Sequence, residues 1–207
     1  MSGMASGTGN HRAPLSERGD DLYETPTAAV WALLQAESLP GHIWEPACGP
    51  GAIVRALRAS GRRVTATDLV DYSCPDSAAR QDFLMEREAP AGIQAIVTNP
   101  PFKLASEFVA HARQLCPKVI MLLRLAFLES ERRRDILEAG DLARVHLFRK
   151  RLPMMHRSGW EGRKSNSGMA FGWFVWDRDH DGPTTLHRIS WEFQEESSPG
   201  REAVRGA

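Results

Sequence analysis

The fold is decided by one stretch, Ile43-Trp44-Glu45-Pro46-Ala47-Cys48-Gly49-Pro50-Gly51, which continues as Ala52-Ile53-Val54-Arg55-Ala56-Leu57-Arg58. A short apolar strand is followed by a glycine turn and by a run whose apolar residues recur at helical spacing. Gly49 and Gly51 have no Cβ atom, so the backbone at this turn can pass close to a ligand. The alternative role for these glycines is close packing of the strand against the helix.

An acidic residue ends the next expected strand, Arg63-Val64-Thr65-Ala66-Thr67-Asp68. Asp68 follows Gly49 by about 20 residues, the interval at which Rossmann-type sheets place a carboxylate on ribose hydroxyls. The competing explanation is that Asp68 caps a helix. A Gly-x-Gly turn alone is a weak signal, and the acid at this interval strengthens it.

A third motif, Asn99-Pro100-Pro101-Phe102, directly follows the apolar run at 93–98. Two prolines fix φ and remove two N–H donors, so nearby carbonyl groups stay free to accept hydrogen bonds. The aromatic ring offers a stacking face for a planar base. Asn-Pro and Pro-Pro are also ordinary turn formers, so alone the tetrapeptide could simply end the sheet.

With these motifs, residues 22 to 176 resemble class I S-adenosylmethionine-dependent methyltransferases, specifically the DNA adenine-N6 type with an Asn-Pro-Pro-Phe tetrapeptide, which phages also carry. The resemblance implies a Rossmann-like α/β fold, with a seven-stranded, mostly parallel sheet flanked by helices, and S-adenosylmethionine as cofactor. It implies that the catalytic residues are Asn99, Pro100, Pro101 and Phe102. The implied cofactor-binding residues are Tyr23, Thr25, Pro26, Glu45, Pro46, Ala47, Cys48, Gly49, Gly51, Asp68, Asp82 and Phe83.

The same resemblance implies a site-specific enzyme that methylates the N6 amine of adenine in DNA. The Asn99 side-chain oxygen and the Pro100 carbonyl would accept hydrogen bonds from the amine, and Phe102 would stack on the base. Three alternatives stay open: an RNA base as substrate, a protein glutamine amide as substrate, and a module that binds cofactor or nucleic acid without catalysis.

Periodicity predicts strands that alternate with helices, as in an α/β protein. Thr25 is expected to cap the first helix, with Pro26 in its first turn. The predicted helices are 26–34, 52–60, 103–115 and 129–138, and the predicted strands are 42–45, 64–67, a short one near 80–84, 93–98, 119–123, 143–148 and 169–176. Residues 72–79 are expected to be irregular.

A basic segment at 149–168 is expected to be a loop that contacts nucleic acid, because positive charge beside aromatic rings suits phosphate contact and base stacking. The ordinary alternative is a solvated charged surface. Arg124, after the strand at 119–123, could reach the site or pair with Glu129. The predicted substrate-binding residues are Arg124, Arg151, His156, Arg157, Trp160, Arg163 and Lys164.

The chain has 207 residues, of which 42% are hydrophobic, enough for one sizeable core. We expect a mobile tail at 1–20, a single methyltransferase domain at 21–193 and a frayed tail at 194–207. The formal net charge is zero, and the three cysteines show no metal-ligand spacing. The sequence therefore predicts a cytoplasmic protein with no metal and no membrane span, acting on nucleic acid, with DNA favoured. The resemblance implies a recognition region besides the catalytic core, but no insertion lies between the glycine turn and Asn99, so a protein partner or a homodimer could assist target recognition.

Overall fold

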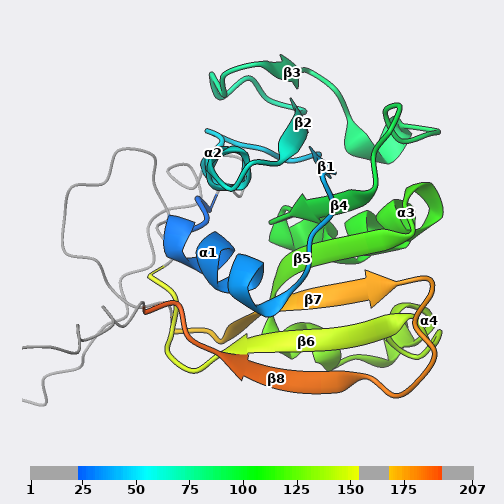
Figure 1. Cartoon of the computed structure of the whole chain (residues 1–207). Helices are drawn as coiled ribbons and strands as arrows, with labels where there is room; N and C mark the ends of the chain where they lie inside the picture. Colours follow the sequence, from blue (N-terminus) through cyan, green and yellow to red (C-terminus); the bar gives the residue numbers. More distant parts are fainter. Residues whose placement is uncertain (1–22, 154–167, 193–207) are drawn as a thin grey trace, which may run out of the picture.

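The computed structural model describes residues 23–153 and 168–192, and they build one sheet. Its strands are β1 His42–Glu45, β2 Arg63–Asp68, β3 Ser77–Ala79, β4 Ala95–Thr98, β5 Lys118–Arg124, β6 Leu142–Phe148, β7 Phe171–Asp177 and β8 Thr185–Ile189. Their order in space is β3-β2-β1-β4-β5-β7-β6-β8 (Figure 1). Only β7 runs antiparallel to its neighbours β5 and β6. The expected α/β fold with a mostly parallel sheet is confirmed, with eight strands where seven were expected.

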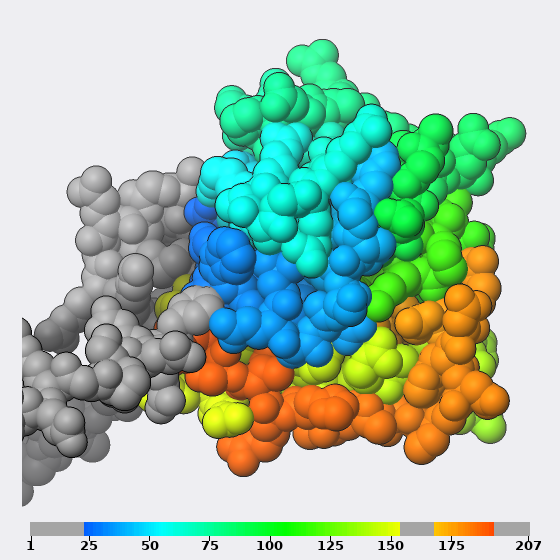
Figure 2. All heavy atoms as spheres, in the orientation of Figure 1, coloured from blue at the N-terminus to red at the C-terminus, as the bar shows by residue number. Residues whose placement is uncertain are grey.

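Helices cover both faces of this sheet. The helices α1 Thr27–Ala36 and α2 Ala52–Ala59 share one buried cluster, which includes Ile120 and Leu122 of β5. The helices α3 Ala105–Leu115 and α4 Arg134–Leu137 share the other cluster with Val119 and Met121 of the same strand. Successive side chains of a strand point to opposite faces, so the continuous apolar run of β5 contributes side chains to both buried clusters. The blue and cyan atoms of α1 and α2 cover the middle of the molecule in Figure 2.

Two expected elements lie elsewhere along the chain. The third strand is Ser77–Ala79, not the stretch near 80–84, and it falls inside the stretch that was expected to be irregular. Residues Phe83–Met85 instead form a 3₁₀ turn, capped by the Asp82 carboxylate, which accepts the Leu84 N–H at 3.0 Å. The charged helix expected at 129–138 is only a 3₁₀ turn at Glu131–Arg133 followed by the single turn of α4.

The eighth strand was not expected at all. The side chains of β8 are mostly exposed, so its sequence shows no apolar alternation that would reveal a strand. It pairs in parallel with β6 from Arg144↔Thr185 to Phe148↔Ile189. The N-terminal end of α1 also differs from expectation: Pro26 occupies the cap position, and no side chain caps the helix.

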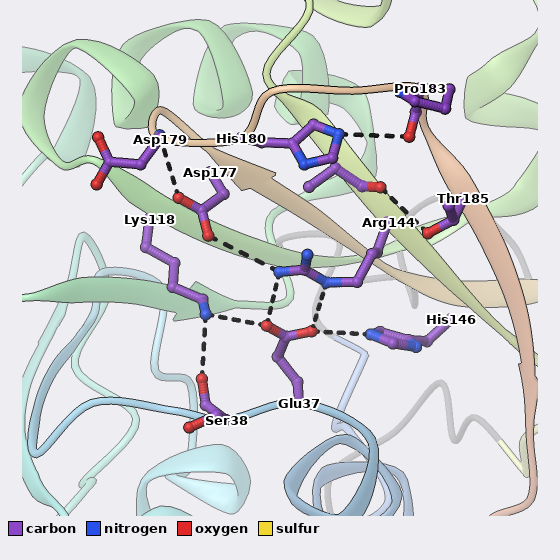
Figure 3. Close-up of polar contacts among 11 residues, drawn as sticks. Glu37, Ser38, Lys118, Arg144, His146, Asp177, Asp179, His180, Pro183 and Thr185 are labelled. Carbon is purple, nitrogen blue, oxygen red and sulfur yellow. Dashed lines mark hydrogen bonds and ion pairs between the residues drawn. The ribbon is translucent and has the colours of Figure 1, made fainter.

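The C-terminal end of α1 is attached to the sheet by a buried ionic cluster (Figure 3). The Glu37 carboxylate accepts hydrogen bonds from Arg144 at 2.8 Å to each oxygen and from Lys118 Nζ at 2.9 Å. His146 Nε2 lies 3.1 Å from the same carboxylate. Burial alone would raise the pKa of Glu37, but the hydrogen bonds from His146, Arg144 and Lys118 together hold it well below its usual range.

Several expectations concern parts of the chain outside the described residues. These are the two tails and most of the basic segment, including His156, Arg157, Trp160, Arg163 and Lys164. None of the helices in the described part of the chain combines the length and apolar character that a bilayer span requires. Within these same residues, no group of three or more His, Cys, Asp or Glu side chains could hold a metal ion.

Candidate functional site

The candidate site lies where the order of the strands reverses. β1 pairs with β2 on one side and with β4 on the other, all in parallel, so the loops after β1 and β4 leave the sheet at neighbouring points. In open α/β sheets, such a switch point at the carboxyl ends of strands is where ligands bind. A cavity of about 500 Å³ is found there. It is lined by Tyr23, Glu24, Thr25, Ala47, Cys48, Gly49, Pro50, Ala52, Ile53, Asp68, Leu69, Val70, Tyr72, Asn99, Pro100, Pro101, Phe102, Lys103 and Leu104.

The turn after β1 supplies one wall of the cavity. Gly49 lines the cavity with a φ of +49°, in the left-handed region that glycine tolerates best. Gly51 is not a lining residue: a Cβ there would lie 2.6 Å from the Cys74 sulfur, and its φ is +89°. Gly51 therefore serves backbone geometry and packing, whereas the lining position of Gly49 agrees with the expected close approach to a ligand.

Asp68, at the end of β2, lies beside this turn. Its Oδ2 accepts the Gly49 N–H at 2.8 Å, and its Oδ1 accepts the Val70 N–H at 2.9 Å. Asp68 thus orders the glycine turn and presents a carboxylate at the cavity.

Asn99 follows β4 and forms the opposite wall. Its Nδ2 donates to the Tyr23 carbonyl at 2.9 Å and to Thr25 Oγ1 at 3.1 Å. A carbonyl oxygen can only accept, so these partners fix which end of the amide faces them. The Oδ1 atom is buried and has no hydrogen-bond partner among the described residues. Thr25 is thus not the cap of α1 that the sequence predicted: its buried hydroxyl orients Asn99.

The rest of the tetrapeptide completes that wall. The Pro101 carbonyl accepts the Leu104 N–H at 3.0 Å. The Pro100 carbonyl accepts no hydrogen bond within the described part of the chain. The Phe102 ring is packed rather than isolated, with its centroid 4.7 Å from that of Tyr23 and 4.3 Å from the Arg124 guanidinium carbon. One ring face is therefore covered by a cation.

Glu45 connects the two walls of the cavity through hydrogen bonds. It is completely buried at the end of β1, and its Oε1 accepts the Thr98 hydroxyl at 2.5 Å and the Ala47 N–H at 3.2 Å. Burial raises the pKa of Glu45 to about 8, with a further contribution from the charge of Asp68. One carboxyl group therefore links the residue before Asn99 to the residue that starts the glycine turn.

Of the expected cofactor-binding residues, Tyr23, Thr25, Ala47, Cys48, Gly49 and Asp68 line the cavity, and Pro26, Glu45, Pro46, Gly51, Asp82 and Phe83 do not. Phe83 lies in the core between Trp44 and Phe108, at centroid distances of 5.2 and 4.9 Å. All four residues of the tetrapeptide line the cavity, and Arg124 lies behind Phe102. Arg151 is exposed.

Sequence reasoning missed several lining residues. Leu69, Val70 and Tyr72 lie within four residues after Asp68, and the place of Asp68 at a strand end could have indicated them. Thr98, which bonds Glu45, was predicted only as part of an apolar strand. Its partner lies 53 residues away, a distance that no local pattern reveals.

Comparison with known proteins supports the fold. No protein-family model matches the sequence, and no curated protein matches it. The fold resembles that of the 23S rRNA methyltransferase ErmE, with a TM-score of 0.52 and 17% identity over 76% of this chain and 70% of that one. Two further structures carry provisional assignments. One, an RNA methyltransferase from Pyrococcus horikoshii, has a TM-score of 0.55 and 13% identity over 75% of this chain and 85% of that one.

The other, a type I restriction enzyme modification subunit from Vibrio vulnificus YJ016, has a TM-score of 0.53 and 12% identity. That match covers 84% of this chain and 48% of the subunit. At such low identities the likeness concerns the fold alone. The fold is the Rossmann-like class I methyltransferase fold, as expected from the resemblance of the motifs.

Proposed function

We propose that the protein is an S-adenosylmethionine-dependent N-methyltransferase that acts on the N6 amine of adenine in DNA. The observation that carries the proposal is the Oδ1 of Asn99, which is buried and has no hydrogen-bond partner in the described part of the chain. It lies in the wall of a cavity whose other wall is the glycine turn. An unsatisfied buried acceptor costs about 1–3 kcal/mol, so a native acceptor without a partner calls for an explanation. A ligand N–H group that donates a hydrogen bond to Asn99 Oδ1 would explain it.

The cavity residues fit the cofactor in chemical type. Asp68 offers carboxylate oxygens that suit two neighbouring ribose hydroxyls, and Gly49 allows close approach of the backbone. The lining also has apolar area, from Ile53, Leu69 and Val70, for a nucleoside. S-adenosylmethionine supplies a methyl group on a positively charged sulfur. Asp82, capping a 3₁₀ turn away from the cavity, is a weaker candidate for contact with the cofactor's adenine.

The tetrapeptide has the donors and acceptors that an aromatic amine requires. An exocyclic amine has two N–H donors, and its lone pair is delocalised into the ring. The Asn99 Oδ1 and the Pro100 carbonyl would accept one hydrogen bond each, which favours a pyramidal nitrogen with its lone pair available. Catalysis would then rest mainly on positioning and on fixed dipoles. A base in a duplex must first be flipped out, at about a few kcal/mol.

Nucleic acid is the favoured substrate class because of where the basic segment begins and ends. β6 runs parallel to β5 and ends at Phe148, and β7 starts at Phe171, so both ends of the segment leave the sheet edge that carries Asn99. Phe171 also packs on Phe102, at a centroid distance of 5.7 Å. DNA rather than RNA is proposed from the resemblance of the tetrapeptide, and target choice would fall to the basic segment or to a partner.

The test is methyl transfer from radiolabelled S-adenosylmethionine to DNA, RNA and protein fractions, followed by mass spectrometry of the released nucleosides. We expect N6-methyladenine from DNA. Asn99→Ala should lower transfer about 100-fold or more while cofactor binding, measured by calorimetry, stays within a few-fold. Gln114→Ala is the matched control, because it removes an exposed amide on α3 that does not line this cavity.

The outcomes separate the alternatives. Label found only in RNA or only in protein would overturn the DNA assignment and leave a methyltransferase of another substrate. Cofactor binding with no transfer to any fraction would indicate a non-catalytic module. Equal loss of transfer and of cofactor binding in Asn99→Ala would show that Asn99 does not act specifically on the amine.

A further inference from the structure

A second, smaller cavity of about 170 Å³ lies beside the first. It is lined by Phe102, Ala105, Leu123, Arg124, Ala126, Phe127 and Arg133. Among the described residues, Phe102 is the only one that lines both cavities. The two spaces therefore meet at the aromatic ring of the tetrapeptide, and whatever occupies the second lies next to the group that would be methylated in the first.

The charge in this cavity is unusual because no described residue gives Arg124 an anionic partner. Its guanidinium stacks on Phe102 at 4.3 Å, and its Nε is buried without a hydrogen bond. Within the described part of the chain no carboxylate pairs with it, and the pair with Glu129 that the sequence allowed is not formed. By contrast Arg113 binds Asp141 and Arg144 binds Glu37, each through two hydrogen bonds.

The second cation, Arg133, reaches the same cavity from the turn before α4. Its guanidinium lies 4.4 Å from the Phe127 ring centroid, and Nη1 donates to the carbonyls of Ala126, Phe127 and Glu129. These contacts, with Nε on Ser106 Oγ at 3.2 Å, hold the group firmly but supply no negative charge. Among the described residues Nη2 is left without a hydrogen bond.

Two guanidinium groups that pair with no carboxylate in the described ranges therefore line one small cavity, and each lies over an aromatic ring. A partly desolvated cation that lacks an anion is costly, and guanidinium groups match phosphate oxygens in geometry and charge. We propose that this cavity binds a backbone phosphate of the nucleic acid, next to the base that Phe102 contacts. The proposal rests on the proposed function and adds a subsite, a ligand class and Arg133 to it.

Two roles for Arg124 can be separated by salt dependence. If Arg124 only supports the Phe102 ring, its loss changes methyl transfer but not the number of counterions released on binding. If it holds a phosphate, its loss removes about one contact, and the slope of log affinity against log salt falls by about 0.9 for duplex DNA.

The test is fluorescence anisotropy of a short labelled duplex, titrated with the full chain over a series of salt concentrations. We expect Arg124→Met, which keeps an unbranched stem, to weaken binding about tenfold at low salt and to flatten the salt slope by about one contact. Arg124→Lys keeps the charge but not the planar group, so the slope should stay close to that of the wild type. The KM for DNA should rise in Arg124→Met while the KM for the cofactor stays constant.

Arg134→Met is the matched control, because Arg134 is exposed and pairs with Glu138, which lies just after α4. Unchanged affinity and slope in a folded Arg124→Met that still transfers methyl groups less well would overturn the phosphate subsite and leave the proposed function standing. If Arg124→Met does not fold, Arg124→Lys provides the test. A salt slope that falls by about one contact in Arg124→Lys, which keeps the charge, would overturn the phosphate subsite. A wild-type chain that transfers methyl groups only to protein would overturn the proposed function, and the subsite with it.

Discussion

Glu45 is a residue whose protonation the structure constrains strongly. Its carboxyl group is buried, and burial raises its pKa from an ordinary value of 4.5 to about 8, although hydrogen bonds from Thr98 and Ala47 partly oppose the change. The group is thus mostly protonated at neutral pH. Because it connects the glycine turn to the strand before Asn99, its ionisation would put a charge beneath the cavity.

This predicts a specific dependence of stability on pH. The folded-state pKa lies above the unfolded one, so the contribution is full below about pH 4.5 and is lost as pH rises towards about 8. Between these values the free energy of unfolding should fall by about 1.4 kcal/mol per pH unit on account of this group. Glu45→Gln, which stays neutral, should lack that slope in urea denaturation at a series of pH values. The same slope in both proteins would show that Glu45 does not titrate as described.

The contact between Thr25 and Asn99 shows where sequence reasoning stops at this scale. The tetrapeptide and the glycine turn are local patterns, and their positions at the ends of β4 and β1 were predicted correctly. Thr25 before a proline is also a local pattern, and it indicated a helix cap. Its hydroxyl instead bonds Asn99, 74 residues away, a choice made by tertiary packing that no local pattern contains.

Among the elements, α1 is attached to the sheet by a buried carboxylate in addition to the apolar packing of its buried face. Glu37 lies just after the helix and binds side chains of β5 and β6 (Figure 3). α1 begins two residues after Thr25, which orients Asn99, so the attachment of α1 also bears on the site. Removal of Glu37 leaves Arg144 and Lys118 largely buried without their shared partner.

We therefore expect Glu37→Ala to lower the free energy of unfolding by about 3–5 kcal/mol, the usual result of breaking a buried ion pair from one side. Glu138→Ala breaks an exposed pair with Arg134 and should cost less than about 1 kcal/mol. Chemical denaturation of both variants measures the difference. Equal effects of the two substitutions would mean that the cluster around Glu37 contributes no more than a surface pair.

The elements that were predicted wrongly share a physical cause. β8 and the turns around α4 are largely exposed, and exposed segments carry little of the apolar periodicity on which prediction relies. β3 has only three residues, none of them buried, and it joins the sheet by pairing with β2. The buried strands β1, β4, β5 and β7 were predicted to within a few residues, because their composition reflects burial directly.

For the molecule as a whole, the arrangement of the sheet brings the sequence motifs together. The glycine turn, Asp68 and the tetrapeptide leave β1, β2 and β4, which are neighbours with carboxyl ends at one edge. The two cavities meet at Phe102 and have different proposed ligands. The larger would bind the cofactor and the amine, and the smaller would bind a phosphate. Every role proposed for these residues depends on the larger cavity being a cofactor site.

Calorimetric titration of S-adenosylmethionine into the purified protein tests that claim most directly. We expect one cofactor bound per chain, at least tenfold weaker binding in Asp68→Ala, and unchanged binding in Asp76→Ala, a mostly exposed aspartate paired with Arg58 that does not line the cavity. Affinity for nucleic acid should be nearly the same in all three proteins. The absence of binding to the wild type, or equal affinity in wild type and Asp68→Ala, would contradict the assignment of the cavity to the cofactor.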